Sequence, residues 1–118
     1  MSDPPMNEAR RNKRRKADDA MPVVDTMTGQ SIGRVGDLSV DGMMLIAEHR
    51  IRDNALYQVT FHLPDARGLP VPIEIGLHEQ WTAPSALPGQ YWTGLRIIDI
   101  SARDLDAIDS WLYREDRT

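Results

Sequence analysis

The chain has 118 residues, of which 41% are hydrophobic and 27% charged, as is usual for a single globular domain. It contains no cysteine, which excludes disulfides and thiolate metal sites, and its three histidines lack metal-ligand spacing. The formal net charge is −4, but six of the fourteen basic residues lie within residues 8–16. Residues 17–118 carry the other eight basic residues and sixteen acidic ones, a charge near −8. An acidic body with a basic arm argues against a generally basic nucleic-acid-binding protein.

The sequence has no apolar run that approaches the roughly 20 residues needed to cross a bilayer. Its N-terminus also lacks the apolar stretch of a signal peptide. We therefore expect a cytoplasmic protein that makes no membrane contact and holds no metal or cofactor.

The chain is expected to begin with a disordered leader, because residues 1–9 are polar and include two prolines. One domain would then occupy residues 10–118, with a basic arm at 10–20, a β region at 21–101 and a helix at 102–116. Hydrophobic alternation and turn residues predict five or six short strands in the β region. The candidate segments are 23–25, 31–35, 43–47, 57–63, 73–77 and 91–100.

Three of these strands have distinctive patterns. Every second residue from Tyr57 to Leu63 is apolar, which predicts a strand buried on one face. Pro70 and Pro72 precede the strand at 73–77 and predict that it has an unpaired edge or a bulged start. The apolar residues of the last strand change phase, which predicts a β-bulge near residues 96–98.

The end of the chain changes from strand to helix periodicity. Ser101 and Asp104 have the spacing of a helix N-cap and its partner, and apolar residues then recur at helical spacing. Trp111 lies on the apolar side and is expected to contact the β region. Short strands followed by one helix predict a small antiparallel barrel or sandwich, with the helix covering a face or an open end.

The basic arm contains two overlapping Arg-x-x-x-Arg pairs, Arg10 with Arg14 and Arg11 with Arg15. A guanidinium is a planar fork of donors that grips phosphate, or the O6/N7 edge of guanine, in bidentate fashion. The simpler alternative is a solvated basic tail, which would bind nucleic acid weakly and with a strong salt dependence.

The segment from Asp37 to Gly42 has the pattern Asp-x-Ser-x-x-Gly. As a structural element it predicts a tight turn in which side chains bond their own backbone. As a binding element it offers a carboxylate at Asp37 that can accept from the N1–H and N2–H₂ groups of guanine. Ser39 would donate to a phosphate or hold the turn, and Gly42 would let the backbone approach a ligand closely.

The arm and this second motif lie about twenty residues apart. They are followed by the strand Trp92-Thr-Gly-Leu-Arg-Ile-Ile-Asp-Ile-Ser101 and by a helix. This combination resembles the PilZ domain family over most of the chain. The resemblance implies a mainly β fold, a six-stranded antiparallel β-barrel with a C-terminal helix and a flexible basic N-terminal arm. It also implies a bacterial receptor for cyclic di-GMP, with the arm wrapped over the ligand. The residues it places at the ligand are Arg10, Arg11, Arg14 and Arg15 of the arm and Asp37, Ser39 and Gly42 of the barrel.

The arm departs from the family pattern in one respect. PilZ arms often have an apolar residue between the arginines that packs the arm down, whereas Asn12 and Lys13 occupy this stretch here. The departure predicts an arm that is mobile in the absence of ligand.

The register of the arginine pair stays open at this point. In one register the pair is Arg10 and Arg14, preceded by Ala9; in the other it is Arg11 and Arg15, preceded by Arg10. In the family, an additional arginine before the pair accompanies an intercalated cyclic di-GMP dimer, and a non-basic residue accompanies a single molecule. Because Arg10 is available, the second register and the dimer are favoured slightly.

Trp81 is a candidate for stacking on a base, and its alternative role is packing at the barrel rim. No acid–base pair, nucleophile arrangement or Gly-rich phosphate loop predicts an enzyme. The expected mechanism is ordering of the arm by the ligand, with output through a partner protein, as in motility or biofilm regulation. The alternative is a nucleic-acid-binding β-barrel. This interpretation is weaker, because such a barrel needs aromatic residues on an exposed strand face, whereas the chain has only three Trp, three Tyr and one Phe and its body is acidic.

Overall fold

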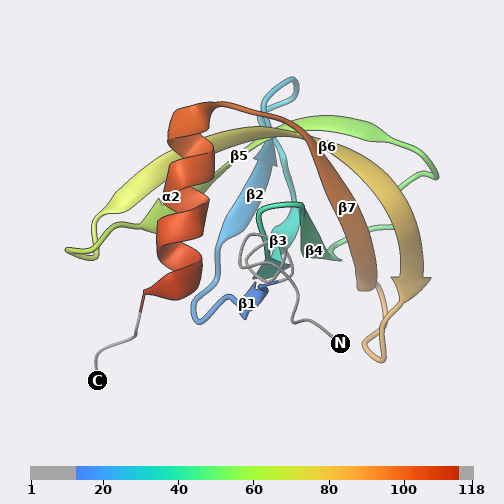
Figure 1. Cartoon of the computed structure of the whole chain (residues 1–118). Coiled ribbons are helices and arrows are strands. Elements are labelled where there is room, and N and C mark those ends of the chain that lie inside the picture. Colours follow the sequence, from blue (N-terminus) through green and yellow to red (C-terminus); the bar gives the residue numbers. More distant parts are fainter. Residues whose placement is uncertain (1–12, 115–118) are drawn as a thin grey trace, which may run out of the picture.

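The computed structural model describes residues 13–114; the predicted leader, Arg10, Arg11 and residues 115–118 lie outside the described residues. The chain forms a closed six-stranded antiparallel β-barrel with one helix after it, as predicted (Figure 1). A two-residue strand precedes the barrel strands. The elements are β1 (Arg15–Lys16), β2 (Pro22–Asp25), β3 (Ser31–Leu38), β4 (Gly42–Ala47), β5 (Leu56–Pro64), β6 (Pro70–Pro84), β7 (Tyr91–Ile100) and α2 (Ala102–Tyr113).

The barrel closes through the pairing of β4 with β3. The strands follow one another in the order β3-β2-β5-β6-β7-β4, and β4 then pairs back onto β3. Inward residues of every strand fill the interior; Val59, Phe61 and Leu63 of β5 are at most 1% exposed. The alternation predicted for β5 is confirmed, and the closed barrel excludes the sandwich alternative.

Strand β6 is longer than predicted, because it extends to Pro84 instead of ending at residue 77. The apolar alternation ends at Leu77, because the next inward position is occupied by a carboxylate, Glu79, which is 3% exposed. Glu79 accepts hydrogen bonds from the Asn54 backbone N–H at 2.9 Å and from the Thr82 hydroxyl at 2.7 Å. Because these hydrogen bonds satisfy the buried carboxylate, the strand continues through Glu79, although a charged residue at an inward position predicts the end of a strand.

Two irregularities of β6 and β7 agree with the predictions. The stretch Pro70–Glu74 pairs with β5 alone, and pairing with β7 begins at Ile75, so the prolines lie where one edge is unpaired. Gly76 pairs with Asp99 and Leu77 with Ile97, so Ile98 is the additional residue of a β-bulge.

Helix α2 begins at the predicted cap, where the Ser101 side chain accepts a hydrogen bond from the Asp104 N–H. The buried Asp104 carboxylate accepts from the backbone N–H of Glu74 at 3.0 Å, which ties the helix to β6. Trp111 is 2% exposed and joins the core, as predicted. The helix ends at Tyr113 instead of residue 116, because Arg114 has extended backbone angles.

Residues 13–114 include no helix that is long and apolar enough to cross a membrane. In the same part of the chain, no group of three or more histidine, aspartate or glutamate side chains is arranged to hold a metal ion.

Candidate ligand-binding site

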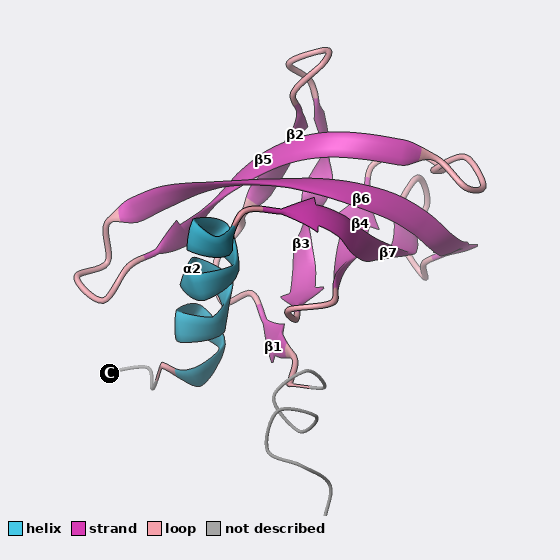
Figure 2. Cartoon of the chain, turned by 45° about the horizontal axis from the view of Figure 1, so that its top comes forward, coloured by secondary structure: helices cyan, strands magenta, loops and turns pink. Residues whose placement is uncertain are grey.

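The basic arm is attached to the barrel by strand β1. Arg15 pairs with Leu38 and Lys16 with Asp37, and the Ala17 N–H donates to the Gly36 carbonyl at 3.0 Å. Figure 2 shows β1 beside the end of β3. Backbone pairing thus attaches residues 15–17 to the barrel without help from an apolar residue in the arm, and the mobility of the arm without ligand stays a prediction.

Arg14 lies against the carboxylate of the second motif. Its Nη1 donates to Asp37 Oδ1 at 2.5 Å, although the two residues are 23 positions apart. The Arg14 side chain is 50% exposed and the Asp37 side chain 18% exposed. The two motifs thus meet at a surface that solvent and ligands can reach, with a donor fork next to an acceptor pair.

Arg15 faces the opposite way, towards helix α2. Its Nη1 donates to the Trp111 carbonyl at 2.6 Å and to the Arg114 carbonyl at 3.1 Å, and its Nη2 lies 3.1 Å from Asp18 Oδ2. The guanidinium also lies 4.5 Å from the centre of the Trp111 ring. Arg14 directly precedes β1 and its side chain points away from that of Arg15, so the structure brings Arg14, and not Arg15, to Asp37. A cation at these last carbonyls also stabilises the helix end.

Ser39 is 2% exposed and holds the turn between β3 and β4. Its hydroxyl accepts from the N–H groups of Asp41 and Gly42, at 3.2 and 3.1 Å, and donates to the Gly42 carbonyl at 3.3 Å. Of the two roles predicted for this hydroxyl, the structure shows that it holds the turn.

Ser39→Ala is expected to lower the free energy of unfolding by about 1–3 kcal/mol, because it removes the acceptor of the buried Gly42 N–H and of the partly buried Asp41 N–H. Urea denaturation measures this loss. Ser85→Ala is the matched control, since the Ser85 hydroxyl holds an exposed loop by similar bonds to Leu87 and should cost about 0.5 kcal/mol or less. Equal losses in the two variants would contradict the role assigned to Ser39.

Gly42 lies where the backbones of β4 and β7 are very close. A Cβ atom at this position would be 2.5 Å from the Leu95 carbonyl oxygen and 3.7 Å from Arg14 Nη2. The glycine thus permits barrel closure and lies next to Arg14 and Asp37. The sequence interpretation considered only the approach of a ligand and missed the approach of this strand.

Trp81 lies on the same outer face as Asp37. Asp37 pairs with Met44, Met44 with Gly94, and Gly94 with Trp81, and residues paired across a sheet share a face. Trp81 is 49% exposed, and its ring lies over Gly94, where a Cβ would be 2.1 Å from Nε1. Trp81 therefore packs on the barrel surface, and stacking on a base stays a prediction.

Sequence reasoning missed two residues of this face. Arg96 is exposed and pairs with Gly42, so it brings a further cation close to the turn. The sequence did not show on which face Arg96 lies, because the apolar alternation of β7 changes phase near this residue. Gly94 provides the space for the Trp81 ring, and a glycine in the interior of a predicted strand was the available signal for such a close approach.

Comparisons with known proteins agree with this architecture. The structure is similar to that of the Bacillus subtilis Inhibitor of motility (MotI/DgrA), with a TM-score of 0.69 and 13% identity, over 84% of this chain and 47% of that one. It is also similar to a pathogenic protein from Xanthomonas campestris, described as a tetrameric PilZ domain, with a TM-score of 0.53 and 19% identity, over 75% of this chain and 49% of that one. At these identities the similarities show the fold alone, and this chain spans about half the length of both.

No curated protein matches the sequence. The family model of the PilZ domain, in contrast, matches residues 8–114. This match includes the basic arm, the barrel and the helix. Together, the match and the six-stranded barrel show that the chain belongs to the PilZ domain family.

Proposed function

We propose that the chain is a cytoplasmic, non-catalytic receptor for cyclic di-GMP that binds the dinucleotide between its arm and the β3–β4 turn. The observation that carries the proposal is the contact between Arg14 and Asp37 beside Gly42. Membership of the PilZ family, whose members are cyclic di-GMP receptor domains, supports it.

The chemistry of this surface complements that of a guanine nucleotide. The Asp37 carboxylate is an acceptor for the N1–H and N2–H₂ groups, an edge that guanine alone offers among the common bases. The Arg14 guanidinium is a donor for phosphate or for the O6/N7 edge. In this proposal Asp37 exchanges its bond to Arg14 for bonds to guanine, and Arg14 turns to the ligand. Arg10 and Arg11 precede the described residues and would supply further cations.

The opposite orientations of Arg14 and Arg15 support the register in which Arg10 and Arg14 form the pair. Arg15 is 15% exposed and bonded to the end of α2, so it would have to break those bonds to reach a ligand. In this register Ala9 precedes the pair, and we propose one cyclic di-GMP per chain instead of the intercalated dimer that the sequence favoured slightly. Trp81 is proposed to stack on a base at the far end of the shared face.

The signalling step is proposed to involve the arm and a partner protein. Positive charges at residues 10–16 repel one another, and a dianionic ligand would offset part of this repulsion. Since β1 already holds residues 15–16 on the barrel, the change would concern Arg14 and the residues before it.

Isothermal titration calorimetry with cyclic di-GMP, GTP and a short single-stranded oligonucleotide, at two salt concentrations, tests the proposal. We expect saturable binding of cyclic di-GMP, with one molecule per chain, and at least about tenfold weaker binding of GTP and the oligonucleotide. Oligonucleotide binding of similar strength that collapses with salt would contradict the proposal and favour the nucleic-acid-binding alternative. A stoichiometry of two would retain the receptor function and contradict the register.

A further inference from the structure

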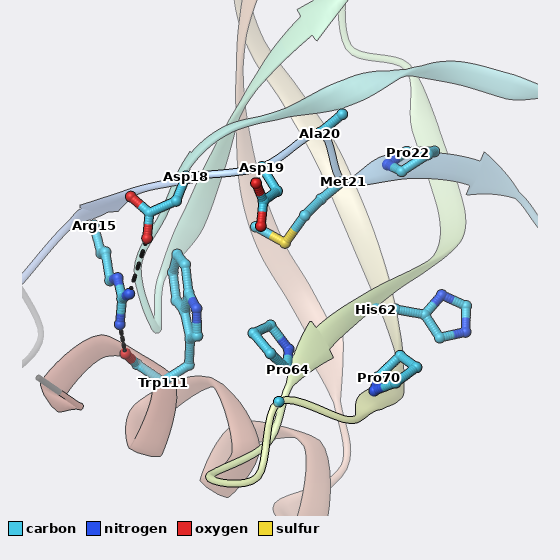
Figure 3. A pocket seen from close by; sticks show the side chains of 11 residues that line it. Arg15, Asp18, Asp19, Ala20, Met21, Pro22, His62, Pro64, Pro70 and Trp111 are labelled. Atoms are coloured by element: carbon cyan, nitrogen blue, oxygen red, sulfur yellow. Dashed lines mark hydrogen bonds and ion pairs between the residues drawn. The ribbon is translucent and has the colours of Figure 1, made fainter. Parts of the chain in front are cut away.

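A second concave site lies on the side of the arm that faces helix α2. It is a cavity of about 590 Å³, within the size range of ligand pockets. Figure 3 shows it between residues 18–22, the ends of β5 and β6, and Trp111 of α2. Arg15 forms one wall, whereas its neighbour Arg14 is bonded to Asp37, so the cavity is separate from the proposed dinucleotide site.

The walls of this cavity are fixed by hydrogen bonds. Arg15 is bonded to the end of α2, and the Met21 carbonyl accepts from the Val35 N–H at 3.0 Å. In the loop between β5 and β6, Asp65 Oδ1 accepts from the N–H groups of Leu69 and Arg67, at 2.9 and 2.8 Å. These two bonds, that of Leu69 first, lower the pKa of Asp65 below its ordinary value. Since the walls are already ordered, little conformational entropy would be lost on binding.

The lining combines an apolar surface with acidic groups. Its apolar part consists of Met21, Pro22, Pro64, Pro70 and Trp111. Its charged side chains are Arg15, Asp18 and Asp19, and the ion pair of Arg15 with Asp18 balances one acid. Asp19 is exposed, its carboxylate lies beside Met21 in the cavity, and the described residues offer it no hydrogen bond or ion pair (Figure 3).

We propose that this cavity docks a lysine or arginine side chain that a partner protein presents on a loop or a chain end. The methylene stem would lie along the exposed Pro22, Pro64 and Pro70, and the cationic head would reach Asp19, an arrangement that suits long basic side chains. The excess negative charge of the lining selects a cation over an anion or a neutral group. The volume of the cavity exceeds the need of a simple amine and fits a short peptide segment.

The test uses the full chain, labelled with ¹⁵N, without cyclic di-GMP, so its outcome is independent of the proposed receptor function. The probes are the blocked tripeptides Ac-Ala-Lys-Ala-NH₂, Ac-Ala-Glu-Ala-NH₂ and Ac-Ala-norleucine-Ala-NH₂, together with n-butylamine. We expect the lysine peptide to give saturable shifts of the Asp19 amide and the Trp111 indole signals. The glutamate and norleucine peptides should bind several-fold more weakly.

Asp19→Asn removes the charge of an exposed side chain and is expected to weaken the lysine peptide about three- to fivefold, as for a solvent-accessible ion pair. Asp53→Asn is the matched control, because Asp53 is exposed in the loop before β5, at the opposite end of that strand. Equal affinity in the two variants, or tight binding of the glutamate peptide, would overturn the proposal. Binding of n-butylamine as strong as that of the lysine peptide would overturn the assignment to a polypeptide.

Discussion

Arg14→Ala is expected to weaken cyclic di-GMP binding about 100-fold or more, while Arg15→Ala weakens it about fivefold or less. Arg14 is half exposed and bonded to Asp37, so its guanidinium is available for charge-assisted bonds to the dinucleotide. Loss of such a bond costs about 2–5 kcal/mol, and about 2.7 kcal/mol corresponds to 100-fold. Isothermal titration calorimetry measures both affinities.

Arg15→Ala should instead affect the stability of the fold. The variant loses two bonds to the end of α2, the ion pair with Asp18 and the contact with the Trp111 ring. We expect the free energy of unfolding to fall by about 2 kcal/mol, which urea denaturation will show. Arg14→Ala should leave it nearly unchanged.

Arg52→Ala controls for the loss of one positive charge, since Arg52 is exposed in the loop between β4 and β5. It should alter neither the affinity nor the stability. If Arg15→Ala abolished binding at unchanged stability, the assignment of Arg14 to the ligand and of Arg15 to the helix would be wrong. The register Arg11/Arg15 would then replace Arg10/Arg14.

The fold was predictable wherever a local pattern had one physical meaning. The alternation from Tyr57 to Leu63 and the cap at Ser101 each specified an element, because the period of the apolar residues and the capping side chain act locally. The phase change of β7 located the bulge at Ile98 for the same reason. The continuation of β6 was missed because Glu79 finds its partners in Asn54, which lies before β5, and in Thr82.

The sequence predicted which residues belong to the candidate site but not how they are arranged. The resemblance to the PilZ family led to the expectation that Arg14 and Asp37 act together, and the structure places them in contact. A run of positive charges, however, does not reveal which member serves a ligand and which serves the fold. That depends on strand β1, which begins at Arg15 and pairs with Leu38 and Asp37: Arg15 faces α2, and Arg14, just before the strand, lies against Asp37. Two residues are too few for alternation to be visible in the sequence.

The cavity beside α2 had no local signal at all. Its walls come from residues 18–22, the loop between β5 and β6, and Trp111, which are brought together by barrel closure and helix docking. Each segment by itself shows an acidic turn, prolines or a core tryptophan, none of which predicts a pocket. Tertiary packing is therefore the source of the proposed docking site.

Gly42→Ala is expected to lower the free energy of unfolding by about 3 kcal/mol, a large effect for a single methyl group. The added Cβ would lie 2.5 Å from the Leu95 carbonyl oxygen. This oxygen belongs to the backbone of β7, which is paired on both sides with β4 and β6, so it cannot move away as a side chain would. The clash thus acts at the β4–β7 contact that helps close the barrel.

Gly29→Ala separates this clash from the usual cost of replacing a glycine. Gly29 has a φ of 75° and open space around its Cβ position, so only backbone strain of about 1–2 kcal/mol is expected. Urea denaturation of both variants, with calorimetry of cyclic di-GMP binding under conditions where each is folded, distinguishes two roles of Gly42. If Gly42→Ala were no less stable than Gly29→Ala but lost binding, the glycine would serve the approach of the ligand. If Gly42→Ala lost more stability than Gly29→Ala and only part of its binding, barrel closure would be the main role of Gly42. Part of the binding would be lost because β4, which begins at Gly42, pairs with β3 and so positions Asp37.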